Sequence, residues 1–120
     1  LMVPAPVQHA MAVALRDTDH VEHQRGVYAA RRALLLDALT DAGLDVDPDS
    51  AAGLYLWVAD PANPTDSWAL VNRLADLGIL AAPGDFYGTA AHGRVRVALT
   101  ATDERVAAAA KRIREAWNVR

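Results

Sequence analysis

The sequence contains no cysteine among its 120 residues. A disulfide framework and a thiolate-ligated metal site are therefore excluded, and a reducing compartment is compatible with the chain but not demonstrated. No apolar run approaches the roughly 18 residues that a membrane-spanning helix requires. The first residues also lack the basic-then-apolar pattern of a secretory signal. We therefore expect neither a disulfide scaffold nor a membrane protein.

Lysine is nearly absent, because Lys111 is the only one in the chain. It lies beside Arg112 and Arg114 in an alanine-rich stretch, on what we expect to be the wet face of a helix. A solvated ammonium is protonated at neutral pH and is a poor nucleophile. The sequence thus predicts that no covalent lysine chemistry originates in this chain by itself.

Positive charge is not in excess, since 12 Lys and Arg residues stand against 15 Asp and Glu, for a formal net charge of −3. This charge balance provides no excess of basic residues for binding nucleic acid, so we do not expect a nucleic-acid-binding protein. Apolar residues make up 52% and charged residues 22%, which is typical of one globular domain with a core. Because the chain begins LMVPAP, we expect it to be a piece of a longer protein.

Hydrophobic spacing and capping residues predict helices mixed with strands. Four helices are expected, over residues 7–15, 19–42, 66–77 and 103–117. Asp19 and Glu22 form a capping pair at the start of the second helix. Thr65 or Asp66 caps the third helix, and Thr102 caps the fourth. Strands are expected over 44–47, 53–59, 79–82 and 95–99. Gly26 interrupts the long helix and allows a bend there.

This order predicts an α+β fold, a two-layer sandwich in which a small, mostly antiparallel sheet carries helices on one face. A long N-terminal helix precedes the sheet. The strand over 53–59, GLYLWVA, is almost continuously apolar, so we expect it to be central and buried on both faces. We expect residues 1–43 to form a lead-in segment and connecting helix, and residues 44–120 to form a small domain.

Two arginines mark the candidate site. Arg94 and Arg96 are two residues apart at the start of an expected strand, so both guanidinium groups project from one face of the sheet. Next to a glycine-rich loop, such an arginine suits two-pronged recognition of a carboxylate or phosphate. The alternative is that both are ordinary solvent-facing charges. The loop start Pro83-Gly84-Asp85 allows either an anion contact or a tight connection.

Other chemistry-bearing residues form no recognised constellation. His20 and His23 are three residues apart without an evident third ligand, so we interpret them as helix-surface histidines rather than a metal site. Nucleophile-elbow, zinc-protease, P-loop and dinucleotide motifs do not occur. The aromatic residues are expected in the core or in a pocket wall rather than as stacking platforms: Tyr55, Trp57, Phe86 and Tyr87.

Three segments, in this order, resemble the C-terminal part of the fold-type I, pyridoxal-phosphate-dependent aminotransferases of class I/II. They are AGLYLWV at 52–58, LADLGILAAPGDFYG at 74–88 and GRVRVALTATDERVAAAAKRI at 93–113. The lead-in PAPVQHAMAVAL is similar to the segment that follows the cofactor-binding core in that family. The sequence LMVPAPVQ is most similar to the corresponding segment of N-succinyldiaminopimelate aminotransferases.

The resemblance implies an aminotransferase small domain whose arginine binds the α-carboxylate of the substrate. The register favours Arg96, and Arg94 takes the role if the strand is offset by two; otherwise Arg94 could sense a distal carboxylate. Phe86, Tyr87 and Gly88 would form part of the pocket wall. The family's pyridoxal 5'-phosphate, an electron sink, is held by a lysine and other groups outside these residues. We therefore expect no catalytic, cofactor-binding or metal-binding residue here, and no activity from this chain alone.

For the whole enzyme, the resemblance implies amino transfer between an amino acid and a 2-oxo acid, with N-succinyl-diaminopimelate or another dicarboxylic substrate as the donor. It also implies a cytoplasmic homodimer with no nucleic-acid or membrane partner. The alternative is a stand-alone, non-catalytic α+β module that binds a small molecule or regulates another protein.

Overall fold

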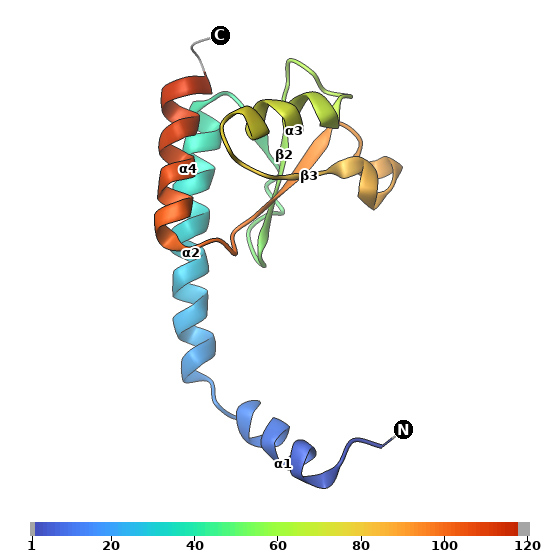
Figure 1. The fold of residues 1–120 in the computed structure, drawn as a ribbon, viewed down its shortest axis with the longest axis vertical. Helices are drawn as coiled ribbons and strands as arrows, with labels where there is room; N and C mark the ends of the chain where they lie inside the picture. Colours follow the sequence, from blue (N-terminus) through green and yellow to red (C-terminus); the bar gives the residue numbers. More distant parts are fainter. Residues whose placement is uncertain (1, 118–120) are drawn as a thin grey trace.

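The computed structural model describes residues 2–117 (Figure 1). Along the chain the elements are α1 (Ala5–Ala14), α2 (Asp19–Asp41), β1 (Asp45–Val46), β2 (Tyr55–Ala59), α3 (Ser67–Asp76), β3 (Ala82–Pro83), the 3-10 helices η1 (Gly84–Tyr87) and η2 (Thr89–Ala91), β4 (Arg94–Ala98) and α4 (Asp103–Ala116).

The four strands form one antiparallel sheet in the order β1-β2-β4-β3. Side chains alternate between its two faces because a strand has a period of two. Leu56 and Val58 of β2 lie opposite Val97 and Val95 of β4, and all four are buried. Helices α2, α3 and α4 each pack one apolar side against this face, in a single core. The predicted α+β sandwich, with helices on one face of a small antiparallel sheet, is confirmed.

The expectation that the strand over 53–59 is buried on both faces is wrong, although its central position is correct. Only the alternate residues Leu56 and Val58 are fully buried, and Tyr55 is 38% exposed. Tyr55 and Trp57 point to the face of the sheet that carries no helix. The apolar run therefore reflects one buried face and one aromatic face.

Two local expectations also need correction. The expected strand over 79–82 is reduced to β3, because the ladder with β4 contains only the pairs Ala82–Arg96 and Pro83–Val95. The helix α2 begins with Thr18 at the N-cap, and the Asp17 carboxylate accepts a hydrogen bond from the Asp19 N–H at 3.1 Å. Asp19 is thus the first helical residue rather than the cap. The helix runs through Gly26 without interruption.

Other expected boundaries agree closely with the structure. The Asp66 carboxylate caps α3 by accepting the Ala69 N–H at 2.9 Å. Thr102 occupies the N-cap of α4, whose buried side begins at Val106 and ends at Trp117.

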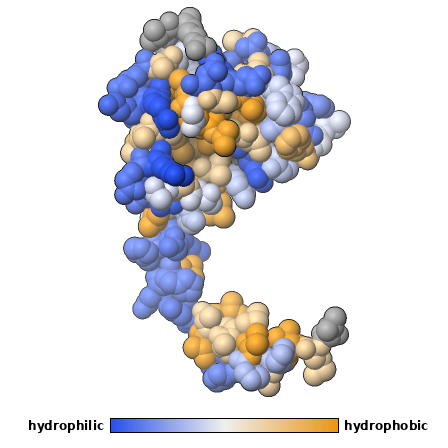
Figure 2. All heavy atoms as spheres, viewed as in Figure 1, coloured by the Kyte–Doolittle hydropathy of each residue, from blue (hydrophilic) through white to orange (hydrophobic). Residues whose placement is uncertain are grey.

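The N-terminal part of the chain extends away from the sheet and its helices. No residue of α1 is buried, and the molecule measures 58 Å along its longest axis. Figure 2 shows a hydrophilic stalk, the first half of α2, between an apolar α1 and the main body. The last turns of α2 belong to the core through Leu35, Ala38 and Leu39, and so does its C-cap residue Ala42.

Candidate functional site

The two candidate arginines lie on the sheet face that carries no helix. In β4 they alternate with buried Val95 and Val97, so the packing of the valines against the core directs both guanidinium groups outward. Arg96 lies opposite Trp57 of β2 and Ala82 of β3. Both arginines are half-buried.

Aromatic rings from two different elements contact Arg96. Its Cζ lies 4.0 Å from the ring centroid of Tyr55 and 4.6 Å from that of Tyr87. The Tyr87 ring also meets the Trp57 ring edge-on, with centroids 5.4 Å apart and planes at 87°. On the open face of the sheet, the guanidinium group of Arg96 is thus flanked by aromatic rings.

The two arginines differ in their partners. Arg94 Nη1 lies 3.2 Å from Asp47 Oδ2, an ion pair that ties β4 to the residue after β1. This contact is an ion pair without hydrogen-bond geometry. The buried Arg94 Nη1 therefore has no hydrogen-bond partner among residues 2–117. Within the same range, no carboxylate lies at ion-pair distance from Arg96. Of the two arginines, only Arg94 therefore has a carboxylate partner within residues 2–117.

The loop between β3 and β4 is held through Asp85. Its Oδ1 lies 2.6 Å from His92 Nδ1 and accepts a longer, 3.4 Å hydrogen bond from the buried Ser67 hydroxyl. These contacts join the first 3-10 helix to the end of the loop and to the start of α3. They support the segment that presents Tyr87 to the sheet.

The structure brings only part of the predicted set together. Tyr87 contacts Arg96, and Arg94 is its neighbour on the same face. Phe86 is 69% exposed and packs on Trp68 instead, with centroids 5.9 Å apart. Gly88 follows Tyr87 at the end of η1, where a Cβ would meet nothing within 4 Å.

Sequence reasoning missed Tyr55 as a contact of Arg96 and Asp47 as the partner of Arg94. The period of two in β2 already places Tyr55 and Trp57 on one face. Their meeting with Arg96 depends on the register between β2 and β4, and that register is a tertiary property.

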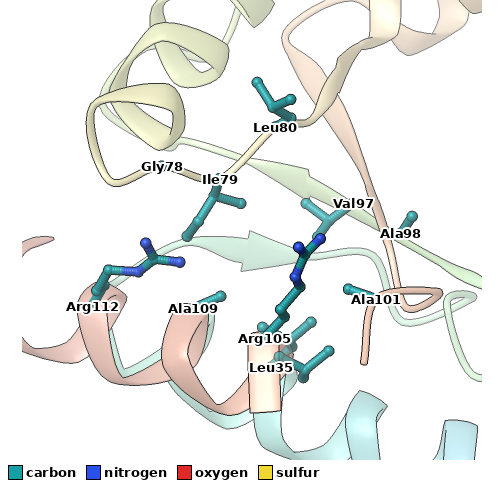
Figure 3. Close-up of a pocket in the computed structure, with 11 residues that line it drawn as sticks. Leu35, Gly78, Ile79, Leu80, Val97, Ala98, Ala101, Arg105, Ala109 and Arg112 are labelled. Carbon is teal, nitrogen blue, oxygen red and sulfur yellow. The ribbon is translucent and has the colours of Figure 1, made fainter. Parts of the chain in front are cut away.

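A cavity of about 500 Å³ lies on the helix side of the sheet (Figure 3). Its lining is Leu35, Gly78, Ile79, Leu80, Val97, Ala98, Ala101, Arg105, Val106, Ala109 and Arg112. Two guanidinium groups stand there over apolar residues, and the lining includes no carboxylate, imidazole or hydroxyl for acid–base work. None of the predicted site residues lines it.

No group of three or more His, Asp or Glu residues gathers to hold a metal ion in the part of the chain that the structure describes. His20 Nδ1 lies 3.4 Å from Asp17. Lys111 is on the surface of α4, with its side chain 72% exposed and its Nζ 3.7 Å from Glu115 Oε1. Over residues 2–117, no helix has the length and apolar character needed to cross a membrane.

Comparison with known proteins identifies relatives over almost the whole chain. The model of the family "Aminotransferase class I and II" matches residues 1–113. The chain is 57% identical over 111 residues to the 4-dedimethylamino-4-oxo-anhydrotetracycline transaminase OxyQ of Streptomyces rimosus, covering 92% of this chain and 30% of that protein.

Solved structures give the same result. An aromatic aminotransferase from Pyrococcus horikoshii superimposes with a TM-score of 0.79 at 26% identity, covering 90% of this chain and 30% of the other. A Thermus thermophilus protein named "probable N-succinyldiaminopimelate aminotransferase" superimposes with a TM-score of 0.70 at 34% identity, covering 83% and 26%. The chain spans about 30% of the length of the curated relatives it matches. The family resemblance noted in the sequence is confirmed, and the chain belongs to the class I and II aminotransferases.

Proposed function

We propose that this chain is the C-terminal part of an aminotransferase and that Arg96 binds the carboxylate of the substrate. The observation that supports this role is the burial and orientation of Arg96, together with its lack of a carboxylate partner. It is half-buried on a strand, faces the open side of the sheet and has no carboxylate partner within residues 2–117.

A guanidinium group suits this task because its planar fork donates two parallel hydrogen bonds to one carboxylate. The strand fixes the base of the side chain, while Tyr87 forms part of the surrounding wall. Arg94 is the alternative ligand, but it would have to exchange Asp47 for the substrate. The same exchange would be needed if Arg94 sensed a distal carboxylate. Phe86 and Gly88 remain proposed wall residues of the larger site.

The proposed reaction is the transfer of an amino group between an amino acid and a 2-oxo acid. The relatives named above act on chemically different substrates, as their names state. N-Succinyl-diaminopimelate or another dicarboxylic amino acid is our proposed donor. A homodimer in the cytoplasm, with small molecules as its partners, completes the proposal.

Aminotransferases of this class use pyridoxal phosphate, and the residues present here do not fit as its holders. A Schiff-base lysine must reach the cofactor, whereas Lys111 is solvated on α4 and faces Glu115. We therefore assign no residue of this chain to the cofactor. The chain alone is expected to be inactive, and its part is to bind and orient the substrate.

The substitution Arg96→Lys in the full-length enzyme tests the proposal. An ammonium keeps the charge but cannot reproduce the fork, so we expect kcat/KM to fall about tenfold to a hundredfold. Arg94→Lys should cost less, because Arg94 already has Asp47 as a partner. Arg25→Lys is the matched control, since Arg25 is exposed and its ion pair within residues 2–117 is with Glu22 on the same helix. Steady-state kinetics with a panel of monocarboxylic and dicarboxylic amino donors measures all three.

Unchanged kinetics for Arg96→Lys with every donor would contradict the assignment. A larger loss for Arg94→Lys than for Arg96→Lys would transfer the role to Arg94. A full-length protein without any transaminase activity would instead favour the binding-module alternative.

A further inference from the structure

The guanidinium group of Arg96 is contacted from two directions in the fold. Tyr55 is on β2 and is a diagonal neighbour of Arg96, because Trp57 is the directly opposite residue. Tyr87 ends η1, on the side where Ala82 of β3 pairs with Arg96. The two rings therefore reach the same group from the two sides of β4, one from β2 and the other from η1.

These rings are not ordinary core residues. Tyr55 is 38% exposed and Tyr87 is 44% exposed, and neither belongs to the buried core. Arg96 Cζ lies over both rings, 4.0 Å from the Tyr55 centroid and 4.6 Å from the Tyr87 centroid, within the range of a cation–π contact. Trp57, on the sheet, packs against the Tyr87 ring in a T-shaped contact.

A guanidinium group is planar, so a ring can attract its faces while its N–H donors point outward from its edge. Rings placed over the cation leave these edge donors for an anion that lies in the guanidinium plane. They also restrict a long side chain that would otherwise sample many rotamers, so less freedom is lost when a ligand binds.

We propose that Tyr55 and Tyr87 are positioning residues that clamp the Arg96 guanidinium between them and aim its edge at a carboxylate. This inference rests on the proposed function for the identity of the ligand, but the clamp itself is a property of the chain alone. The rings carry the effect and the phenolic hydroxyl groups are not required. Leucine at either position should therefore weaken the clamp, whereas phenylalanine should preserve it.

The first test is the NMR signal of the Arg96 Nε–H group in the 120-residue chain, assigned by its loss in Arg96→Lys. Ring currents should displace its proton resonance from those of exposed arginines such as Arg25. Tyr55→Leu and Tyr87→Leu should each return it toward the exposed position, while Tyr55→Phe and Tyr87→Phe should leave it displaced. Trp68→Leu is the control, because that exposed ring contacts Phe86 and not Arg96. An undisplaced signal in the unmodified chain would overturn the proposal, even if the leucine variants failed to fold.

The second test measures what the clamp does for binding. Sodium acetate serves as the carboxylate probe and sodium chloride at equal ionic strength as the reference, with the Arg96 Nε–H shift as readout. We expect the acetate dissociation constant to rise about twofold to fivefold in each leucine variant and to stay unchanged in each phenylalanine variant. Equal affinities in the leucine and phenylalanine variants would refute the positioning role.

The two proposals fail in different ways. A displaced Arg96 signal together with unchanged kinetics of Arg96→Lys in the full-length enzyme would leave the clamp and remove the proposed function. An undisplaced Arg96 signal together with a large loss of kcat/KM in Arg96→Lys would remove the clamp and leave the proposed function.

Discussion

Two arginines that are two residues apart on β4 have different electrostatic surroundings. Asp47 neutralises Arg94 across the edge of the sheet, whereas aromatic faces support the charge of Arg96. Aromatic faces attract the cation without occupying its donors, and Asp47 offsets the charge of Arg94 at ion-pair distance without a hydrogen bond to Nη1. The side chains nearby thus give the two guanidinium groups different partners, although both groups lie on the same face of the sheet.

The pair formed by Arg94 and Asp47 should contribute little to stability. Both side chains are about one-third exposed, so we expect Asp47→Asn to lower the free energy of unfolding by at most about 1 kcal/mol. Urea unfolding of Asp47→Asn, Arg94→Gln and the double variant measures the coupling free energy between the two side chains. A coupling above about 2 kcal/mol would show that the pair is a structural requirement.

Glu104 in the first turn of α4 should make stability depend on acid pH. Its own backbone N–H and the Thr102 hydroxyl donate to the carboxylate and hold its pKa below the ordinary 4.5. A lowered pKa in the folded state favours folding when the pH is above 4.5, and this contribution disappears as the pH falls through the lowered pKa. Wild type should therefore exceed Glu104→Gln in stability at about pH 7, with the difference shrinking below about pH 4.5. Parallel urea titrations at about pH 7 and about pH 3 test this, and a constant difference would contradict it.

At the scale of elements, the loop between β3 and β4 depends on close backbone approach. A Cβ on Gly84 would lie 1.9 Å from the carbonyl oxygen of Ala91, and one on Gly93 would lie 1.8 Å from that of Pro64. Gly93 also has a φ of +73°, a conformation that L residues rarely adopt. Backbone atoms cannot move aside as a flexible side chain would, so the loop requires glycine at both positions.

We therefore expect Gly84→Ala and Gly93→Ala to destabilise the chain by about 2–3 kcal/mol or more. Gly26→Ala is the matched control, because its Cβ would meet nothing within 4 Å in an exposed helix. Alanine there should raise stability by up to about 1 kcal/mol. Circular dichroism during urea unfolding compares the three variants. Similar effects at all three glycines would contradict the close-approach argument.

At the scale of the whole molecule, α1 contributes nothing to the core. Its exposed apolar side chains include Val7, Met11 and Val13, and the polar first half of α2 separates it from the sheet (Figure 2). The last turns of α2 share the core with the sheet, so the expected division at residue 43 stays a prediction.

Deletion of residues 1–16 should therefore leave the free energy of unfolding within about 0.5 kcal/mol of that of the intact chain. The retained core lies in α2, the sheet, α3 and α4, and the deleted helix α1 has no buried residue. Urea unfolding followed by tryptophan fluorescence measures this. A loss above about 1.5 kcal/mol would show that α1 packs on the body in solution.

The sequence by itself determined most of the helices of this protein, its central strands and its family. Helix ends at Gly43 and Gly78 and a cap at Thr65 or Asp66 could be predicted, because capping and positive-φ positions restrict the residue type locally. The period of two along a strand likewise predicted that Arg94 and Arg96 share a face.

Only the tertiary structure decided which arginine lacks a carboxylate partner within residues 2–117 and what surrounds it. Asp47 and Tyr55 are far from β4 in the sequence and meet it through strand register, while Tyr87 reaches it through the anchored loop. The tertiary structure also decided that the strand beginning at Tyr55 has one buried face. The apolar character of a residue predicts that it avoids water, but the neighbour that covers it depends on long-range packing.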